Sequence, residues 1–188
     1  MIKIGITGSL ASGKTTASKI LSSRRGPLFS ADKAVKELYE NKHFKSLISR
    51  KFKIKTNNQL KRSLKRLIIK NKNNIKKLER IIHPLVRKKM KNFTSKNKKK
   101  KLLFYEIPLL IESKLMKYFN VIVFIKAKKQ RRHKRFLSKS GEKKLFNLLN
   151  NKQISHIKKI KFCDHVVVNE KNLNILKKNL LVIISKYE

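Results

Sequence analysis

Apolar residues recur in two different rhythms along the chain, and the alternation of these rhythms predicts an α/β fold. Short apolar runs typical of strands lie at 2–7, 27–30, 102–107, 121–125 and 165–168, and the run at 121–125 is almost entirely β-branched. Between most of these runs, apolar residues fall three and four positions apart, as they do on one face of a helix. Strands that alternate with helices predict a five-stranded parallel sheet with helices on both faces.

Two long helical regions interrupt this alternation. The first extends over about 32–100, where His83-Pro84 separates two helical stretches. The second extends over 128–161, is very basic, and has a break at Ser140-Gly141. Shorter helices are expected at 14–23, 109–117 and 170–186.

The charge of the chain is strongly positive. Its 188 residues include 51 Lys and Arg against 10 Asp and Glu, a formal net charge of +41. Such a charge normally indicates a nucleic-acid or anionic-membrane partner. Here the lysines are spread along the whole chain, which is also rich in Asn and Ile, residues that share A/T-rich codons with Lys. We therefore interpret much of the charge as compositional bias, with a selected polyanion-binding surface as the alternative.

Cysteine content and hydropathy place the chain among cytoplasmic proteins. Cys163 is the one cysteine, so no intrachain disulfide can form. Met1 to Gly5 lacks the apolar stretch of a signal peptide, and no apolar run reaches membrane-spanning length. We expect a soluble cytoplasmic monomer without a membrane or a specific nucleic-acid partner.

The strongest chemical signal is the segment from Gly8 to Thr15, Gly-Ser-Leu-Ala-Ser-Gly-Lys-Thr, which matches G-x-x-x-x-G-K-[ST]. This P-loop follows a predicted strand and opens a predicted helix, so its backbone N–H groups can surround the phosphates of ATP. Lys14 can reach the β and γ phosphates, and the Thr15 hydroxyl can bind Mg²⁺. The residues expected to bind ATP are Gly8, Ala11, Ser12, Gly13, Lys14, Thr15 and Thr16.

Two acids follow predicted strands at the same sheet edge as the P-loop. Asp32 comes just after the second strand, where a carboxylate can accept the proton of an attacking hydroxyl; the alternative is a helix N-cap. Glu106 ends the third strand, where it can lie near Mg²⁺; the alternative is a half-exposed strand end. Arg135 and Lys139 are four residues apart in the basic region, so we expect them to share a helix face and to reach the phosphates.

These observations predict one P-loop kinase domain with two helical additions. The core comprises 1–31, 101–127 and 162–188, the insertion that binds the acceptor covers about 32–100, and the lid covers about 128–161.

Further short motifs occur in a specific order and spacing. They are Ser30-Ala31-Asp32, His83-Pro84, Pro108-Leu109-Leu110-Ile111-Glu112, Arg135 to Gly141 with its Arg-x-x-x-Lys-x-Gly pattern, Gln153 with Lys159, and Asp164 to Asn169 with its Asp-x-Val-x-x-Asn pattern. Together with the P-loop, they make the chain resemble the dephospho-coenzyme A kinase family from near the first residue to about Asn169.

The resemblance implies phosphorylation of the ribose 3′-hydroxyl of dephospho-coenzyme A by ATP and Mg²⁺, the last step of coenzyme A synthesis. It implies that Asp32 is the base, with Lys14, Arg135 and Lys139 as further catalytic residues. It implies Thr15 and Glu106 at the metal. Residues implied for acceptor binding are Asp32, His83, Pro108, Leu109 and Glu112.

The chain also departs from the family pattern. Ser30 replaces an acid, Ile160 stands where an Arg is usual, and Lys139 replaces a lid Arg, which keeps the charge but loses bidentate geometry. Because the P-loop and Asp32 are retained, we expect an active enzyme. The alternatives are another small-molecule or nucleoside monophosphate kinase of this fold and, from a different class, a basic nucleic-acid-binding protein with steeply salt-dependent affinity.

Overall fold

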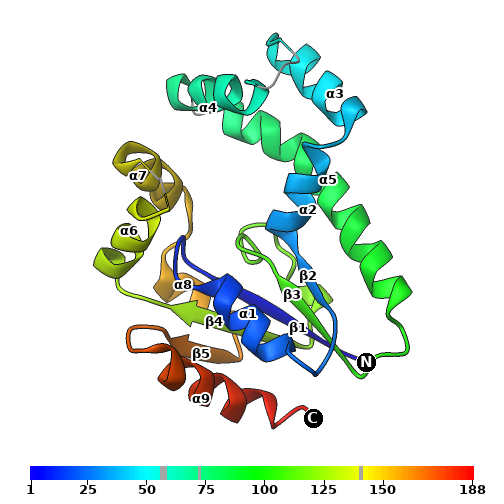
Figure 1. Cartoon of the computed structure of the whole chain (residues 1–188), viewed down its shortest axis with the longest axis vertical. Coiled ribbons are helices and arrows are strands. Elements are labelled where there is room, and N and C mark those ends of the chain that lie inside the picture. Colours follow the sequence, from blue (N-terminus) through cyan, green and yellow to red (C-terminus); the bar gives the residue numbers. More distant parts are fainter. Residues whose placement is uncertain (56–58, 72, 140–141) are drawn as a thin grey trace. The chain divides into compact units, whose positions relative to one another are not determined.

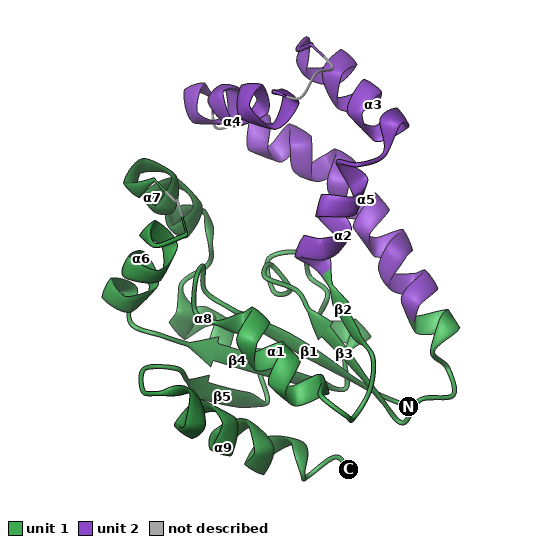
Figure 2. Ribbon diagram, in the orientation of Figure 1, with its two compact units in different colours: residues 1–30, 94–188 green, residues 31–93 purple. Residues whose placement is uncertain are grey.

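The protein consists of two compact units. A computed structural model describes residues 1–55, 59–71, 73–139 and 142–188. Unit 1 comprises residues 1–30 and 94–188, and unit 2 comprises residues 31–93 (Figure 2).

A five-stranded parallel sheet forms the centre of unit 1, as predicted (Figure 1). Its strands are β1 (Ile2–Gly8), β2 (Leu28–Ser30), β3 (Leu102–Glu106), β4 (Val121–Lys126) and β5 (His165–Val168). Their order is β2-β3-β1-β4-β5, and every pairing is parallel. β1 is therefore the middle strand, and the loop after it leaves the centre of the carboxyl edge, where ligands bind in open α/β sheets.

Helices α1 (Lys14–Ser22) and α9 (Leu173–Ile184) lie together on one face of the sheet (Figure 1). Alternate strand residues such as Ile4, Ile6 and Phe104 point to this face and pack against the two helices. The buried helix residues of this core are Ala17, Leu21, Leu176, Leu180 and Ile184. This packing fixes the start of α1 directly after the loop that follows β1.

The segment 107–120 covers the other face, and here the predicted helix over 109–117 is wrong. The segment forms turns and a short 3₁₀ helix, η1 (Met116–Tyr118). Lys114 has a left-handed φ of 53°, which ends any helical path. Leu110 is fully buried, within reach of the backbone at Gly5. The apolar residues of this segment have the spacing of a helix, but they belong to a loop that packs them against the sheet.

The basic region contains α6 (Lys129–Leu137), α7 (Lys143–Lys152) and α8 (His156–Ile160), all within unit 1. Phe146 is fully buried between α6 and α7, with the rings of His133 and Phe136 packed against it. The predicted break at Ser140-Gly141 lies outside the described residues.

Unit 2 is helical, with α2 (Ala31–Leu38), α3 (Lys42–Phe52), α4 (Leu60–Lys70) and most of α5 (Asn73–Lys96). Its buried core residues are Leu38, Phe44, Ile48, Leu60 and Leu64.

The expected separation of two helical stretches at His83-Pro84 is wrong, because α5 continues through Pro84. A proline inside a helix removes one backbone hydrogen bond. Apolar residues before and after it, Ile81, Ile82, Leu85 and Val86, pack against the same core, and this packing keeps the helix continuous.

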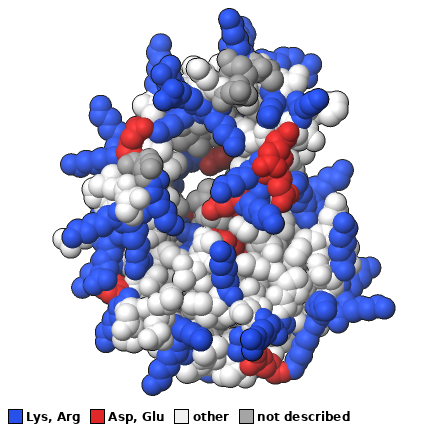
Figure 3. Space-filling model, viewed as in Figure 1, with Lys and Arg blue, Asp and Glu red and all other residues white. Residues whose placement is uncertain are grey.

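Lys and Arg side chains are distributed over the visible faces of both units rather than gathered on one element (Figure 3). Within the described ranges, none of the helices combines the length and the apolar character needed to span a bilayer.

Candidate nucleotide-binding site

The loop between β1 and α1 has a backbone conformation that only small residues allow. Gly13 has a φ of 95°, and a Cβ there would lie 2.2 Å from Nδ2 of Asn169. A Cβ on Gly8 would lie 2.4 Å from the carbonyl oxygen of Ile125. Ala11 also adopts a left-handed conformation, with a φ of 57°. A backbone contact therefore requires glycine at position 8, and the left-handed backbone favours glycine at position 13.

The first turn of α1 follows this loop directly. The first intrahelical hydrogen bond runs from the Ala17 N–H to the Gly13 carbonyl, 3.1 Å. The N–H groups of residues 14–16 therefore precede the intrahelical ladder and can bind an anion. No acidic residue lies in this turn to compete with such an anion.

Two polar side chains of the motif are buried beside these donors. Lys14 is 8% exposed, and its Nζ donates to the Ser9 carbonyl, 2.8 Å. Ser12 is fully buried, and its Oγ has no hydrogen-bond partner among the described residues. A buried hydroxyl normally has a partner, so this group fits a loop that binds a polar ligand.

The structure brings together the two residues predicted to hold a metal. Thr15 Oγ1 donates to Oε1 of Glu106 at 2.5 Å, and the Glu106 side chain is nearly fully buried. A hydroxyl and a carboxylate are oxygen donors of the kind Mg²⁺ prefers, and Mg²⁺ usually takes few protein ligands beside substrate phosphates. The part of the chain that is described contains no group of three or more His, Cys, Asp or Glu that could form a protein-only metal cage. The pair therefore fits Mg²⁺ held jointly with phosphates.

Arg135 lies at the loop, as predicted, and Asn169 lies beside it. Arg135 donates to the Ser12 carbonyl at 3.3 Å and to the Asn169 carbonyl at 3.2 Å. Asn169 Nδ2 also donates to the Ser12 carbonyl, at 2.8 Å. The prediction that Lys139 shares a helix face with Arg135 is wrong: α6 ends at Leu137, and Lys139 is exposed beyond it.

A second set of contacts to the loop was not anticipated from the sequence, although Gln153 was singled out there as part of a motif. Arg132 is 7% exposed and donates to the Leu10 carbonyl at 3.2 Å. The Leu10 N–H donates to Oε1 of Gln153 at 3.0 Å. Together with Ser9 and Asn150, these side chains line a pocket of about 550 Å³. Nothing in the sequence distinguishes Arg132 from the other basic residues of its helix.

Glu112 and Lys159, both singled out in the sequence, form a buried ion pair. Lys159 Nζ lies 2.6 Å from Oε1 of Glu112, although the angles are not those of a hydrogen bond. The Lys159 side chain is fully buried, and that of Glu112 is 16% exposed. Nearby, the Pro108 carbonyl accepts a hydrogen bond from Thr7 Oγ1, 3.2 Å, and Leu109 is half-buried.

Asp32 and His83 lie in unit 2. Asp32 is in the first turn of α2, directly after β2, and His83 lies inside α5. Because the P-loop lies in unit 1, the roles predicted for these two residues toward ATP and its acceptor stay predictions.

Comparison with known proteins identifies the family of the chain. The sequence model of the dephospho-CoA kinase family matches residues 2–174. A dephospho-CoA kinase from Bartonella quintana is 34% identical over 175 residues, covering 90% of each chain.

Two solved structures are also similar to this chain over nearly its whole length. A protein from Thermus thermophilus has 28% identity and a TM-score of 0.81, covering 100% of this chain and 98% of its own. A dephospho-CoA kinase from Campylobacter jejuni has 25% identity and a TM-score of 0.65, covering 99% of this chain and 97% of its own. The chain belongs to the dephospho-CoA kinase family.

Proposed function

We propose that this protein transfers the γ-phosphate of ATP to the ribose 3′-hydroxyl of dephospho-CoA, which yields CoA and ADP in the last step of CoA synthesis. The observation that carries the proposal is the Thr15–Glu106 pair at the mouth of a P-loop, in a chain that matches this family over nearly its whole length. Such a pair is suited to a kinase, because it could hold Mg²⁺ together with phosphates at the carboxyl edge of the sheet.

At the ATP end, the loop would enclose the phosphates with residues Gly8, Ala11, Ser12, Gly13 and Thr16. The N–H groups of residues 14–16, which precede the intrahelical hydrogen bonds, would supply donors for the phosphate oxygens. Lys14 would exchange its contact with the Ser9 carbonyl for a phosphate oxygen. Thr15 and Glu106 would hold Mg²⁺, which when bound neutralises charge between the β and γ phosphates.

At the acceptor end, we assign Asp32 to orient the 3′-hydroxyl and take its proton as the oxygen attacks. The carboxylate follows β2 directly, and parallel strands direct their carboxyl ends to the edge where the P-loop lies. The further residues proposed for acceptor binding are His83, Pro108, Leu109 and Glu112. Arg135 and Lys139 would stabilise the charge of the transferring phosphoryl group.

We also propose a function for each large segment of the chain. Residues 32–100 would bind the acceptor, residues 128–161 would act as the lid, and the remaining segments would form the core. We also infer that the protein acts as a cytoplasmic monomer without a specific nucleic-acid partner. The wide distribution of basic side chains favours this inference over a dedicated nucleic-acid surface (Figure 3). Light scattering on the purified protein measures its mass in solution directly.

An acceptor panel tests the proposed substrate. We expect dephospho-CoA to be phosphorylated much faster than nucleoside monophosphates at equal concentration, with one phosphate added at the ribose 3′ position, as read by mass and phosphorus NMR spectra. Faster phosphorylation of a nucleoside monophosphate would favour the related kinase alternative. Affinity for DNA or RNA that falls steeply with salt, with no acceptor turnover, would favour the nucleic-acid alternative.

A further inference from the structure

Leu10, at the tip of the P-loop, has both of its backbone groups bound by side chains from the basic region. Arg132 of α6 donates to its carbonyl oxygen, and Gln153, which directly follows α7, accepts from its N–H. We call the side chains of Arg132 and Gln153 the Leu10 clamp. The clamp joins residues more than a hundred positions apart in the chain.

The Arg132 side chain is itself fixed on several sides. Its Nε donates to the Ala127 carbonyl at 3.2 Å, and its Nη1 also donates to Oδ1 of Asn150 at 2.8 Å. The guanidinium lies 5.9 Å from the ring centre of Phe146, which is the buried residue between α6 and α7. The planar guanidinium has donors on separate nitrogens in a fixed arrangement, so it can hold three segments at once, whereas the three donors of an ammonium group radiate from a single nitrogen.

The residue that follows Leu10 explains why the loop needs such support. Ala11 has a φ of 57°, in a region that residues with a Cβ adopt only at an energetic cost. Strained backbone persists where the surrounding structure fixes it. Holding Leu10 by both backbone groups fixes the peptide that enters Ala11, and therefore the direction of the N–H groups that follow.

We propose that the Leu10 clamp is a positioning device that keeps the P-loop in its phosphate-binding conformation and couples it to the segment from α6 to Gln153. The proposal rests on the proposed function, because its ligand is the triphosphate of ATP. Arg132 acts through the Leu10 backbone rather than on a reacting atom. Loss of the clamp therefore lowers the fraction of molecules whose loop is ready to bind ATP, and apparent affinity falls by that fraction.

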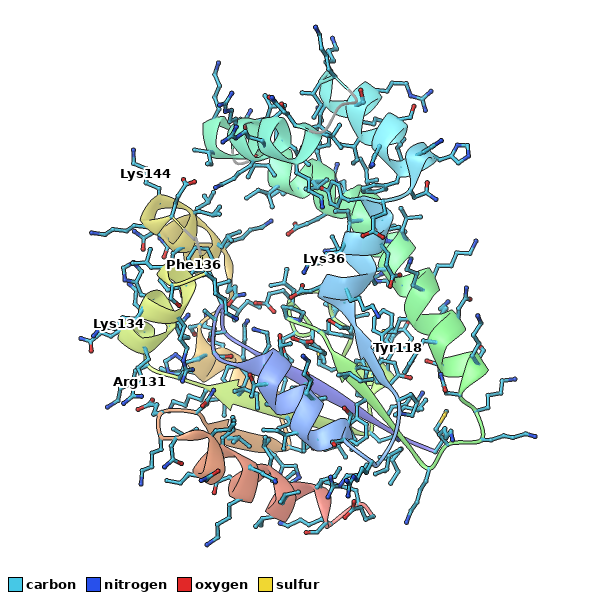
Figure 4. The ribbon with its side chains drawn as sticks, viewed as in Figure 1. Lys36, Tyr118, Arg131, Lys134, Phe136 and Lys144 are labelled. Carbon is cyan, nitrogen blue, oxygen red and sulfur yellow. The ribbon has the colours of Figure 1, made fainter. Side chains whose placement is uncertain are left out.

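Arg132→Gln tests the clamp, with Arg131→Gln as the matched control. Arg131 is exposed, and its side chain extends away from α6 in Figure 4, so both variants remove one arginine from the same helix. The affinity for ATP is measured by calorimetry without any acceptor, and kcat and both KM values are measured separately. If about a tenth of the loops remain competent, Arg132→Gln raises the Kd and KM for ATP about tenfold. It leaves the KM for dephospho-CoA unchanged and kcat at saturating ATP within about threefold. Arg131→Gln leaves all of these values unchanged.

Gln153 variants test the clamp without removing a buried charge. Gln153→Leu removes the acceptor of the Leu10 N–H and should weaken ATP binding, whereas Gln153→Glu keeps an acceptor and should preserve it. These variants decide the question if Arg132→Gln does not fold.

Three results would overturn the proposal. The first is unchanged ATP affinity in folded Arg132→Gln or in Gln153→Leu. The second is an equal loss of ATP affinity in Arg131→Gln. The third is a fall in kcat of Arg132→Gln with ATP affinity retained, which would place Arg132 on the transferring phosphate. Wild-type protein that does not bind ATP would overturn the proposed function as well, so the two failures are distinguishable.

Discussion

The Glu112–Lys159 pair leads to a sharp prediction about stability. In the wild-type protein, the fully buried Lys159 ammonium lies 2.6 Å from a carboxylate oxygen of Glu112. The substitution Glu112→Gln removes this counter-charge and hardly changes the shape of the side chain. Removing one partner of a buried ion pair costs about 3–5 kcal/mol, because the other charge stays buried and uncompensated. For a chain of 188 residues, where 1 kcal/mol corresponds to about 2–4 °C, the melting temperature should fall by about 6–20 °C.

An exposed ion pair of the same type provides the control. Glu37 accepts a hydrogen bond from Lys89 at 2.5 Å, and this bond lowers the pKa of the Glu37 carboxyl. Both side chains are more than a third exposed. Exposed pairs contribute about 1 kcal/mol or less, so Glu37→Gln should change the melting temperature by a few degrees at most.

Calorimetric melting of both variants, and of Glu112→Leu combined with Lys159→Met, completes the test. Replacing a buried pair by apolar residues of similar volume is often neutral or stabilising, so the double variant should recover most of the loss. The reasoning is refuted if Glu112→Gln costs no more than Glu37→Gln, or if the double variant is as unstable as the single one. A raised KM for dephospho-CoA in folded Glu112→Gln would separately support the proposed acceptor role.

Three further predictions concern the reaction and the cysteine. Asp32→Asn should lower kcat about 10²- to 10⁴-fold, the usual contribution of a general base, while the calorimetric Kd for ATP changes less than threefold; unchanged kcat would remove Asp32 from this role. Glu106→Gln should raise the Mg²⁺ concentration needed for half-maximal activity at fixed ATP, because the partner of Thr15 loses its charge; an unchanged Mg²⁺ titration would place the metal elsewhere. Burial raises the pKa of the Cys163 thiol from 9.0 to about 11, so at pH 8 its thiolate is roughly 100-fold scarcer than in the unfolded chain. Iodoacetamide should therefore alkylate native Cys163 about 100-fold more slowly than the denatured protein, and equal rates would contradict the burial.

Much of the fold follows from local patterns in the sequence. The five strands were predictable because each is a short apolar run rich in β-branched or aromatic residues, and the central ones, β1, β3 and β4, are buried along almost their whole length. The proximity of Thr15 and Glu106 was also anticipated in kind. Glu106 ends β3 and Thr15 follows the loop after β1, and these two neighbouring parallel strands have their carboxyl ends at one edge. The order β2-β3-β1-β4-β5 was not predicted, because strand neighbours depend on long-range packing rather than on any one run.

The errors arose where tertiary packing overrode local spacing. The run around Leu110 has helical spacing but forms turns, because its apolar side chains fill the face of the sheet opposite α1. Pro84 suggested a helix boundary, yet apolar residues on both sides share one core. The role of Arg132 in the Leu10 clamp could not be predicted, because the sequence does not show which of the 51 Lys and Arg residues is buried.

The most direct test of the central claim is the rate of ADP formation from ATP and Mg²⁺, with and without dephospho-CoA, at two salt concentrations. We predict that dephospho-CoA raises this rate strongly at both concentrations and that CoA accumulates in equal amount to ADP. ADP formation that does not respond to dephospho-CoA, or that occurs without CoA as product, would contradict the account.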